Sequence, residues 1–197
     1  MSNNLGIYPI LLLPAQNTTL PDLSPKISTS GMGDVRCGVS EKEFLDYLNH
    51  YFKDWVYPQQ QVIVPGQERP FVVDYLIREP ITNLHIDVEL DEPMAKDGTL
   101  IHFAGKDDYR NRFFVEAGWV VIRFCEEQVV SQPHRCCRFI GNVLAHLTKQ
   151  SAMADASATA YAQPFADIPP LTPVQQWSKS RAKSLRRQGY RQGYLSH

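Results

Sequence analysis

Residues 84–91 read Leu84-His85-Ile86-Asp87-Val88-Glu89-Leu90-Asp91. Apolar and polar side chains alternate through the stretch, which predicts a β-strand because successive side chains of a strand point to opposite faces. Asp87, Glu89 and Asp91 therefore share one face. Strands are depleted in Asp, and neighbouring carboxylates repel each other, so this face is expected to need a compensating cation. A divalent metal such as Mg²⁺, which binds carboxylate oxygens, is one candidate.

A second acid lies in the preceding apolar run. Residues 71–77 have the length of a strand, carry Asp74 in their middle and are followed by the stop signal Arg78-Glu79-Pro80. A short connection then leads into the strand at 84–91, so we expect Asp74 to lie beside Glu89. The alternative is that Asp74 is a hydrogen-bonded core acid and that the three acids line the solvent-facing side of an amphipathic strand.

A helix is expected before these strands, from Ser40 to about Trp55. Ser40 and Glu43 have the spacing of a capping box. Apolar residues then recur at helical spacing: Phe44, Leu48, Tyr51, Phe52 and Trp55. At 100° per residue Glu41 falls inside the apolar sector and Glu43 outside it. We therefore predict that Glu43 caps the helix and that Glu41 faces the interior.

The remaining elements complete an alternating order. A first strand is predicted at 60–64, a loop at 92–106, a helix from Asp107, a nearly continuous apolar strand at 119–125 and a last helix at 133–149. On the helix that starts at Asp107, Arg110 shares the inward side and can pair with Asp107 one turn earlier. The expected order is helix, three strands, helix, strand, helix.

Five pieces in this order resemble the PD-(D/E)xK nuclease superfamily, in particular its very-short-patch-repair-like branch. They are Glu41, Val72-Val73-Asp74, Glu89-Leu90-Asp91, Asp107 with Arg110, and Gly118-Trp119-Val120-Val121-Ile122-Arg123-Phe124. The resemblance covers about residues 40–148. It implies an α/β fold with a restriction-endonuclease-like core, α-β-β-β-α-β-α, in which helices flank a mixed sheet.

The resemblance also implies an activity, the metal-dependent hydrolysis of DNA phosphodiester bonds in a repair, restriction, phage-defence or mobile-element system. Asp74 and Glu89 would hold Mg²⁺ or Mn²⁺, and Glu41 and Asp91 would bind it through water or bind a second ion. A nearby His or Lys would orient the attacking water. Arg110 would either position the carboxylates through Asp107 or Asp91, or form a plain structural salt bridge.

The chain departs from the family pattern where a lysine is usual, because Asp91 stands there. Relatives with Asp at this place often continue D-G-x-x-H, whereas this chain continues Glu92-Pro93-Met94-Ala95. His102 either takes the place of that histidine or is an ordinary loop residue, and Lys96 or Lys106 could supply the missing cation. The alternative function is therefore a catalytically weak or inactive nuclease fold that serves as a DNA-binding or assembly module.

The composition predicts four segments: an N-terminal extension (1–39), the nuclease-like core (40–150), a flexible Ala/Ser/Pro-rich linker (151–176) and a basic, aromatic tail (177–197). The predicted nucleic-acid-binding residues of the tail are Lys179, Arg181, Lys183, Arg186, Arg187 and Arg191. Because the whole chain has a formal net charge of −1, these six cations leave −7 on the rest. The tail could attract DNA, dock on a protein partner or simply be solvated.

Apolar runs in the sequence stay well short of the roughly 18–20 residues of a membrane span. The first residues, Met1-Ser2-Asn3-Asn4, lack the basic region of a signal peptide. We therefore expect a cytoplasmic protein without a membrane partner.

Overall fold

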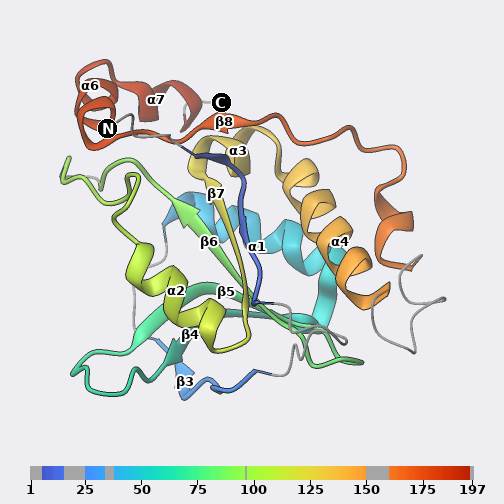
Figure 1. Ribbon diagram of the computed structural model, residues 1–197. Coiled ribbons are helices and arrows are strands. Elements are labelled where there is room, and N and C mark those ends of the chain that lie inside the picture. Colours follow the sequence, from blue (N-terminus) through green and yellow to red (C-terminus); the bar gives the residue numbers. More distant parts are fainter. Residues whose placement is uncertain (1–5, 16–24, 34–37, 96, 150–159, 196–197) are drawn as a thin grey trace.

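The computed structural model describes residues 6–15, 25–33, 38–95, 97–149 and 160–195. Its centre is a mixed sheet of six strands in the order β2-β7-β6-β5-β4-β3 (Figure 1). Three strands form an antiparallel meander: β4 (Val56–Val62), β5 (Phe71–Arg78) and β6 (His85–Asp91). β7 (Val120–Cys125) runs parallel to β6. The short strands β2 (Ile10–Leu12) and β3 (Gly31–Met32) form the two edges, so the predicted α/β class with a mixed sheet is confirmed.

Helices cover both faces of the sheet. α1 (Val39–Phe52) and α4 (Pro133–Lys149) pack with Ile86, Val88 and Leu90 of β6 in one core. α2 (Asp108–Glu116) packs on the opposite face, where Phe114 contacts a second core that includes Val121. The short helix α3 (Glu126–Ser131) connects β7 to α4. Between residues 39 and 149 the helices and strands thus follow the expected succession, except that α3 precedes the last helix.

The alternation that predicts β6 places its acids on the side of α2, because its apolar residues fill the opposite core. Asp87 is fully buried, and Glu89 and Asp91 are only 3% and 2% exposed. The alternative of a solvent-facing acidic side is therefore wrong. These carboxylates lie inside the protein, where each needs a hydrogen bond, a cation or a proton.

The start of α1 differs from the prediction. The helix begins at Val39, Gly38 occupies the N-cap position, and no side chain caps it. Ser40 lies inside the helix, where its hydroxyl donates to Glu126 Oε1 at 2.7 Å. The predicted capping box of Ser40 and Glu43 is therefore wrong. The predicted orientation of the two acids holds, since Glu43 is exposed and Glu41 is half-buried.

Both terminal segments belong to the folded unit. β1 (Ile7–Tyr8) pairs with β8 (Val174–Gln175), which brings the N-terminal segment beside the C-terminal part of the chain (Figure 1). The C-terminal part forms the 3₁₀ turn η2 (Gln163–Phe165) and the helices α6 (Lys179–Arg187) and α7 (Tyr190–Leu195).

The expectation of a flexible linker and tail is therefore wrong for the described residues, and residues 150–159 lie outside them. Tyr161 and Phe165 are buried against the α1–α4 core, and Trp177, Leu185 and Tyr194 are buried as well. Hydrophobic burial of this kind holds a segment in place even where its surface is strongly basic.

α7 is also held by buried polar contacts. Arg191 donates to Glu126 of α3 at 2.7 Å and to Glu92 at 2.8 Å. The Tyr194 hydroxyl donates to Glu126 Oε2 at 2.7 Å, and the Tyr190 hydroxyl donates to Glu127. Arg191 is therefore engaged inside the protein, contrary to its predicted role as a free nucleic-acid contact.

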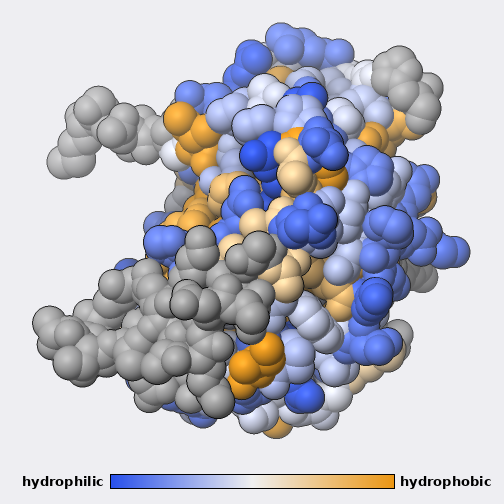
Figure 2. All heavy atoms as spheres, turned by 90° about the vertical axis from the view of Figure 1, so that its right-hand side faces the viewer, coloured by the Kyte–Doolittle hydropathy of each residue, from blue (hydrophilic) through white to orange (hydrophobic). Residues whose placement is uncertain are grey.

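The surface seen in Figure 2 lies on the right-hand side of Figure 1. Hydrophilic residues predominate there, and apolar ones form separate patches. None of the helices in the described part of the chain combines the length and the apolar character needed to cross a bilayer.

Candidate functional site

Asp74 and Glu89 meet where the ladder between β5 and β6 ends. Paired residues run from Arg78 opposite His85 to Tyr75 opposite Val88. Beyond that point the Asp74 N–H donates to Glu89 Oε1 at 3.3 Å, and the Leu90 N–H donates to Asp74 Oδ2 at 2.8 Å. Side chains thus replace the backbone bonds of the ladder, and the two acids lie beside each other as the sequence predicts.

Glu41 faces the same place from the start of α1. Burial raises the pKa of Asp74 well above its usual range, and the charges of Glu89 and Glu41 raise it further. Gln59 Nε2 donates to Glu41 Oε2 at 3.2 Å and holds that carboxylate toward the sheet. The three acids predicted to bind a metal therefore gather at one place and repel one another, which is the electrostatic condition that a cation would relieve.

Arg110 contacts Glu89 directly. Its guanidinium donates to Glu89 Oε1 and, at 2.8 Å, to the backbone oxygen of Val72. The rings of Phe71 and Phe114 each lie 5.5 Å from the guanidinium carbon. The sequence predicted Asp107 or Asp91 as the partner, but α2 instead aims Arg110 at the centre of the sheet.

Arg123 is a site residue that the sequence-based list lacks. It lies beside Glu89 in the parallel pairing of β6 and β7. Its Nε atom donates to both Asp91 oxygens, at 3.1 and 3.2 Å, and its Nη1 atom lies 3.8 Å from Glu89 Oε2. A signal was available, because Arg123 is the one charged residue of the apolar run 119–125.

His102 lies beside these acids and forms a pair with Asp107. Its Nδ1 atom is 2.9 Å from Asp107 Oδ2 and 3.6 Å from Asp91 Oδ1. Burial acts to lower the pKa of His102, but the hydrogen bond with Asp107 and the charge of Asp91 outweigh it, so the pKa is raised. Trp177 Nε1 donates to the backbone oxygen of His102 at 2.5 Å, so the C-terminal segment helps to hold this loop.

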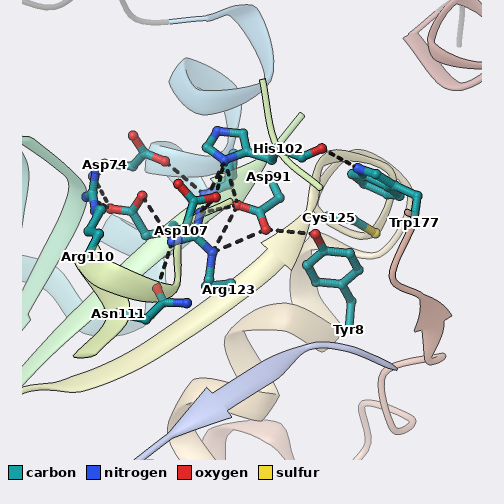
Figure 3. A network of polar contacts seen from close by, with 12 residues as sticks. Tyr8, Asp74, Asp91, His102, Asp107, Arg110, Asn111, Arg123, Cys125 and Trp177 are labelled. Atoms are coloured by element: carbon teal, nitrogen blue, oxygen red, sulfur yellow. Dashed lines mark hydrogen bonds and ion pairs between the residues drawn. The ribbon is translucent and has the colours of Figure 1, made fainter. Parts of the chain in front are cut away.

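Asp91, His102 and Asp107 offer ligand atoms that all lie within 4.8 Å of one another, and such a group could hold a metal ion. Arg123 Nη2, however, already lies 3.3 Å from both His102 Nδ1 and Asp107 Oδ2, and closer still to Asp91. Figure 3 shows this guanidinium at the centre of the network, with Asp74 and Arg110 on one side and His102 on the other. A metal at this group would have to displace Arg123.

A cleft of about 730 Å³ opens next to the acids. Its lining includes Glu41 and Ser40 from the start of α1, Glu92, Glu126 and Arg191. Glu41 thus belongs both to the lining of the cleft and to the acid cluster, whereas Asp74 and Glu89 do not line the cleft. Among the predicted nucleic-acid contacts, Arg191 is engaged in ion pairs, whereas the basic residues of α6 are exposed: Lys179, Arg181, Lys183, Arg186 and Arg187.

Comparison with protein-family models, with curated proteins and with solved structures found no match for this chain. The resemblance to PD-(D/E)xK nucleases stays a prediction from the sequence motifs.

Proposed function

We propose that this protein is a metal-dependent endonuclease that hydrolyses DNA phosphodiester bonds on a restriction-endonuclease-like core. The observation that carries the proposal is the meeting of Asp74 and Glu89 at the end of the β5–β6 ladder, next to Glu41. Two acids that meet where the ladder between adjacent strands ends create a cluster of oxygen ligands, and the cleft beside Glu41 leaves room for a phosphate.

The donor set of Asp74, Glu89 and Glu41 suits Mg²⁺ or Mn²⁺, because hard cations prefer carboxylate oxygens. Burial raises the pKa of Asp74, and the charges of Glu89 and Glu41 raise it further while Arg110 only partly balances them. A bound cation would relieve that repulsion between the carboxylates. A bound ion would supply Lewis-acid stabilisation of the charge that develops on the phosphate. Arg110, which holds Glu89 in place, would be a positioning residue.

His102 is suited to move the proton of the attacking water. Its Nδ1 atom is committed to Asp107, which orients the ring and leaves Nε2 as the atom that exchanges protons. Asp91 and Arg123 both contact the His102 ring of the His102–Asp107 pair. The base and the carboxylate that orients it therefore lie across the Asp91–Arg123 pair from the acid cluster.

Cleavage of supercoiled plasmid, measured with Mg²⁺, with Mn²⁺ and with EDTA, tests the proposal. Asp74→Asn and Glu89→Gln should each reduce nicking at least about 100-fold, since each replaces a charged ligand by a neutral one of similar shape. Glu41→Gln should also reduce it. The matched control is Glu43→Gln, which changes an exposed acid two residues away and should retain wild-type cleavage. Nicking that survives EDTA, or full activity of Asp74→Asn, would remove the proposed metal site.

The second candidate is an inactive nuclease fold that serves as a DNA-binding or assembly module. One observation favours it: Glu89 and Asp91 are already paired with Arg110 and Arg123 in the protein interior. Calorimetric titration with Mn²⁺ separates the two candidates. Saturable binding by the wild type and its loss in Asp74→Asn favour the enzyme, whereas no saturable binding and no cleavage favour the module.

A further inference from the structure

α6 presents a basic face in a fixed position. Ala182 and Leu185 are buried with Tyr8 and Trp177, which anchors the helix on the domain. At 100° per residue four of its basic residues fall within an arc of about 100°, whose centre lies about 120° from that of the buried pair. These exposed residues are Lys179, Lys183, Arg186 and Arg187. Arg181 lies outside this arc.

One end of this face reaches the loop that carries His102. The Lys179 amino nitrogen lies 5.6 Å from the centre of the Phe103 ring, and that of Lys106 lies 5.9 Å from it. Two ammonium groups from distant parts of the sequence thus flank one ring, directly after His102. Lys106 therefore continues the basic face of α6 at the loop that carries His102.

The other end reaches the cleft. The Arg186 guanidinium lies so close to Gly98 that a Cβ atom there would be 2.5 Å from its carbon. Gly98 has a φ of +83° and lines the cleft together with Glu41, Asp97 and Arg186. The positive φ favours glycine at position 98, and the Arg186 guanidinium packs against it. Arg186 therefore places a cation in the lining of the cleft, close to Asp97.

We propose that these five cations, Lys106, Lys179, Lys183, Arg186 and Arg187, form a phosphate track. It binds the phosphodiester backbone of a nucleic acid and leads it past His102 to the cleft lined by Glu41. The inference deepens the proposed function and rests on it for the roles of His102 and Glu41. α6 has nine residues, or about 13 Å at 1.5 Å each, which matches about four base-pair steps of 3.4 Å.

Charge explains why the track would dominate binding. Phosphate contacts from Lys and Arg supply most of the sequence-independent affinity for nucleic acids. Outside residues 178–197 the chain carries a formal charge of −7, which repels a polyanion. Arg191 is excluded from the track because Glu126 and Glu92 already neutralise it.

The test is the double charge reversal Lys183→Glu/Arg187→Glu in the full chain. The matched control is Lys53→Glu/Arg69→Glu, which changes the net charge equally at two exposed residues outside the track. Fluorescence anisotropy in EDTA would follow binding of a labelled duplex of about 20 base pairs and of a single strand of about 20 nucleotides over a series of salt concentrations. Matching thermal melts would show that both variants are folded.

We expect the track variant to bind at least about 10-fold more weakly and its salt slope to fall by about 1.8, since each phosphate contact contributes about 0.9. The control should stay within about twofold of wild type. Weaker binding of the duplex, of the single strand or of both by the track variant supports the track and identifies its ligand. Unchanged binding in the track variant, or an equal loss in the control, overturns it.

The same experiment distinguishes failure of the track from failure of the proposed function. Binding is measured without metal, so its result is independent of cleavage. If wild type binds through the track but never cleaves, the proposed activity fails and the track stands. If the track variant binds normally and cleavage still depends on Asp74, the track fails and the activity stands.

Discussion

The Arg123 guanidinium donates to both carboxylate oxygens of Asp91, with Nε at 3.1 and 3.2 Å from them. Both side chains are buried, at 1% and 2% exposure. The Tyr8 hydroxyl donates to the same carboxylate at 2.7 Å, so the pair also fastens the N-terminal segment. This buried pair separates the acid cluster at Asp74 from the His102–Asp107 pair.

Arg123→Met should lower the free energy of unfolding by about 3–5 kcal/mol, because it leaves the Asp91 charge buried without its partner. Urea denaturation followed by circular dichroism measures the loss. Adding Asp91→Asn to Arg123→Met should restore part of the stability, since it removes the unpaired charge. Wild-type stability of Arg123→Met would contradict the assignment of a buried ion pair.

Asp74→Asn and Glu89→Gln should change the melting temperature in opposite directions in EDTA at pH 7.5. The pKa of Asp74 is raised, so its ionisation costs stability at neutral pH and Asn removes that cost. Glu89→Gln weakens the ion pair with Arg110 and should lower the melting temperature. Differential scanning calorimetry tests this, and the gain from Asp74→Asn should vanish at acidic pH, where Asp74 is protonated in both states.

The pKa of His102 should lie above its ordinary value of 6.5, as the Asp107 hydrogen bond and the Asp91 charge imply. A raised histidine pKa contributes stability that is present below 6.5 and is lost as the pH rises through the higher, folded-state value. NMR titration of the ring protons measures the pKa, and Asp107→Asn should shift it downward. A His102 pKa that is insensitive to Asp107→Asn would mean that the pair does not form in solution.

Glu79 should stabilise the fold through its bond to Tyr161, which joins β5 to the segment after residue 159. The fully buried carboxylate accepts from the Tyr161 hydroxyl at 2.6 Å and from the Thr82 N–H at 2.6 Å. Although burial acts to raise the pKa of Glu79, the hydrogen bonds from Thr82 and Tyr161 lower it below 4.5. The stability it contributes is therefore present above 4.5 and is lost as the pH falls through the folded-state pKa.

Tyr161→Phe should accordingly cost about 1.5–3 kcal/mol at pH 7, the usual contribution of a hydrogen bond to a charged group. Urea denaturation at several pH values checks this. The difference from wild type should shrink as the pH falls through the lowered pKa of Glu79, where the carboxylate becomes protonated. A difference that is independent of pH would indicate that Tyr161 acts through packing alone.

The elements whose pattern is local could be predicted from the sequence. Strict alternation identifies β6 and puts Asp87, Glu89 and Asp91 on one face, and helical periodicity separates Glu41 from Glu43. Both results follow from backbone geometry, which repeats every two residues in a strand and every 3.6 in a helix. The short connection between β5 and β6 was likewise sufficient to bring Asp74 to Glu89.

The partner of each charged group was decided by tertiary structure alone. Tyr8 reaches Asp91 across 83 residues and Arg191 reaches Glu126 across 65, so no local pattern contains either contact. Tertiary structure also decided how the C-terminal segment is held. Its basic residues predict a flexible tail, but its buried aromatic residues anchor it on the domain. Composition and periodicity determined the strands, the helices and the faces of the acids. Long-range packing decided which cation lies beside which acid and where α6 presents its basic face. The reason is that a carboxylate needs a partner only when it is buried, and it is buried only once the chain is folded.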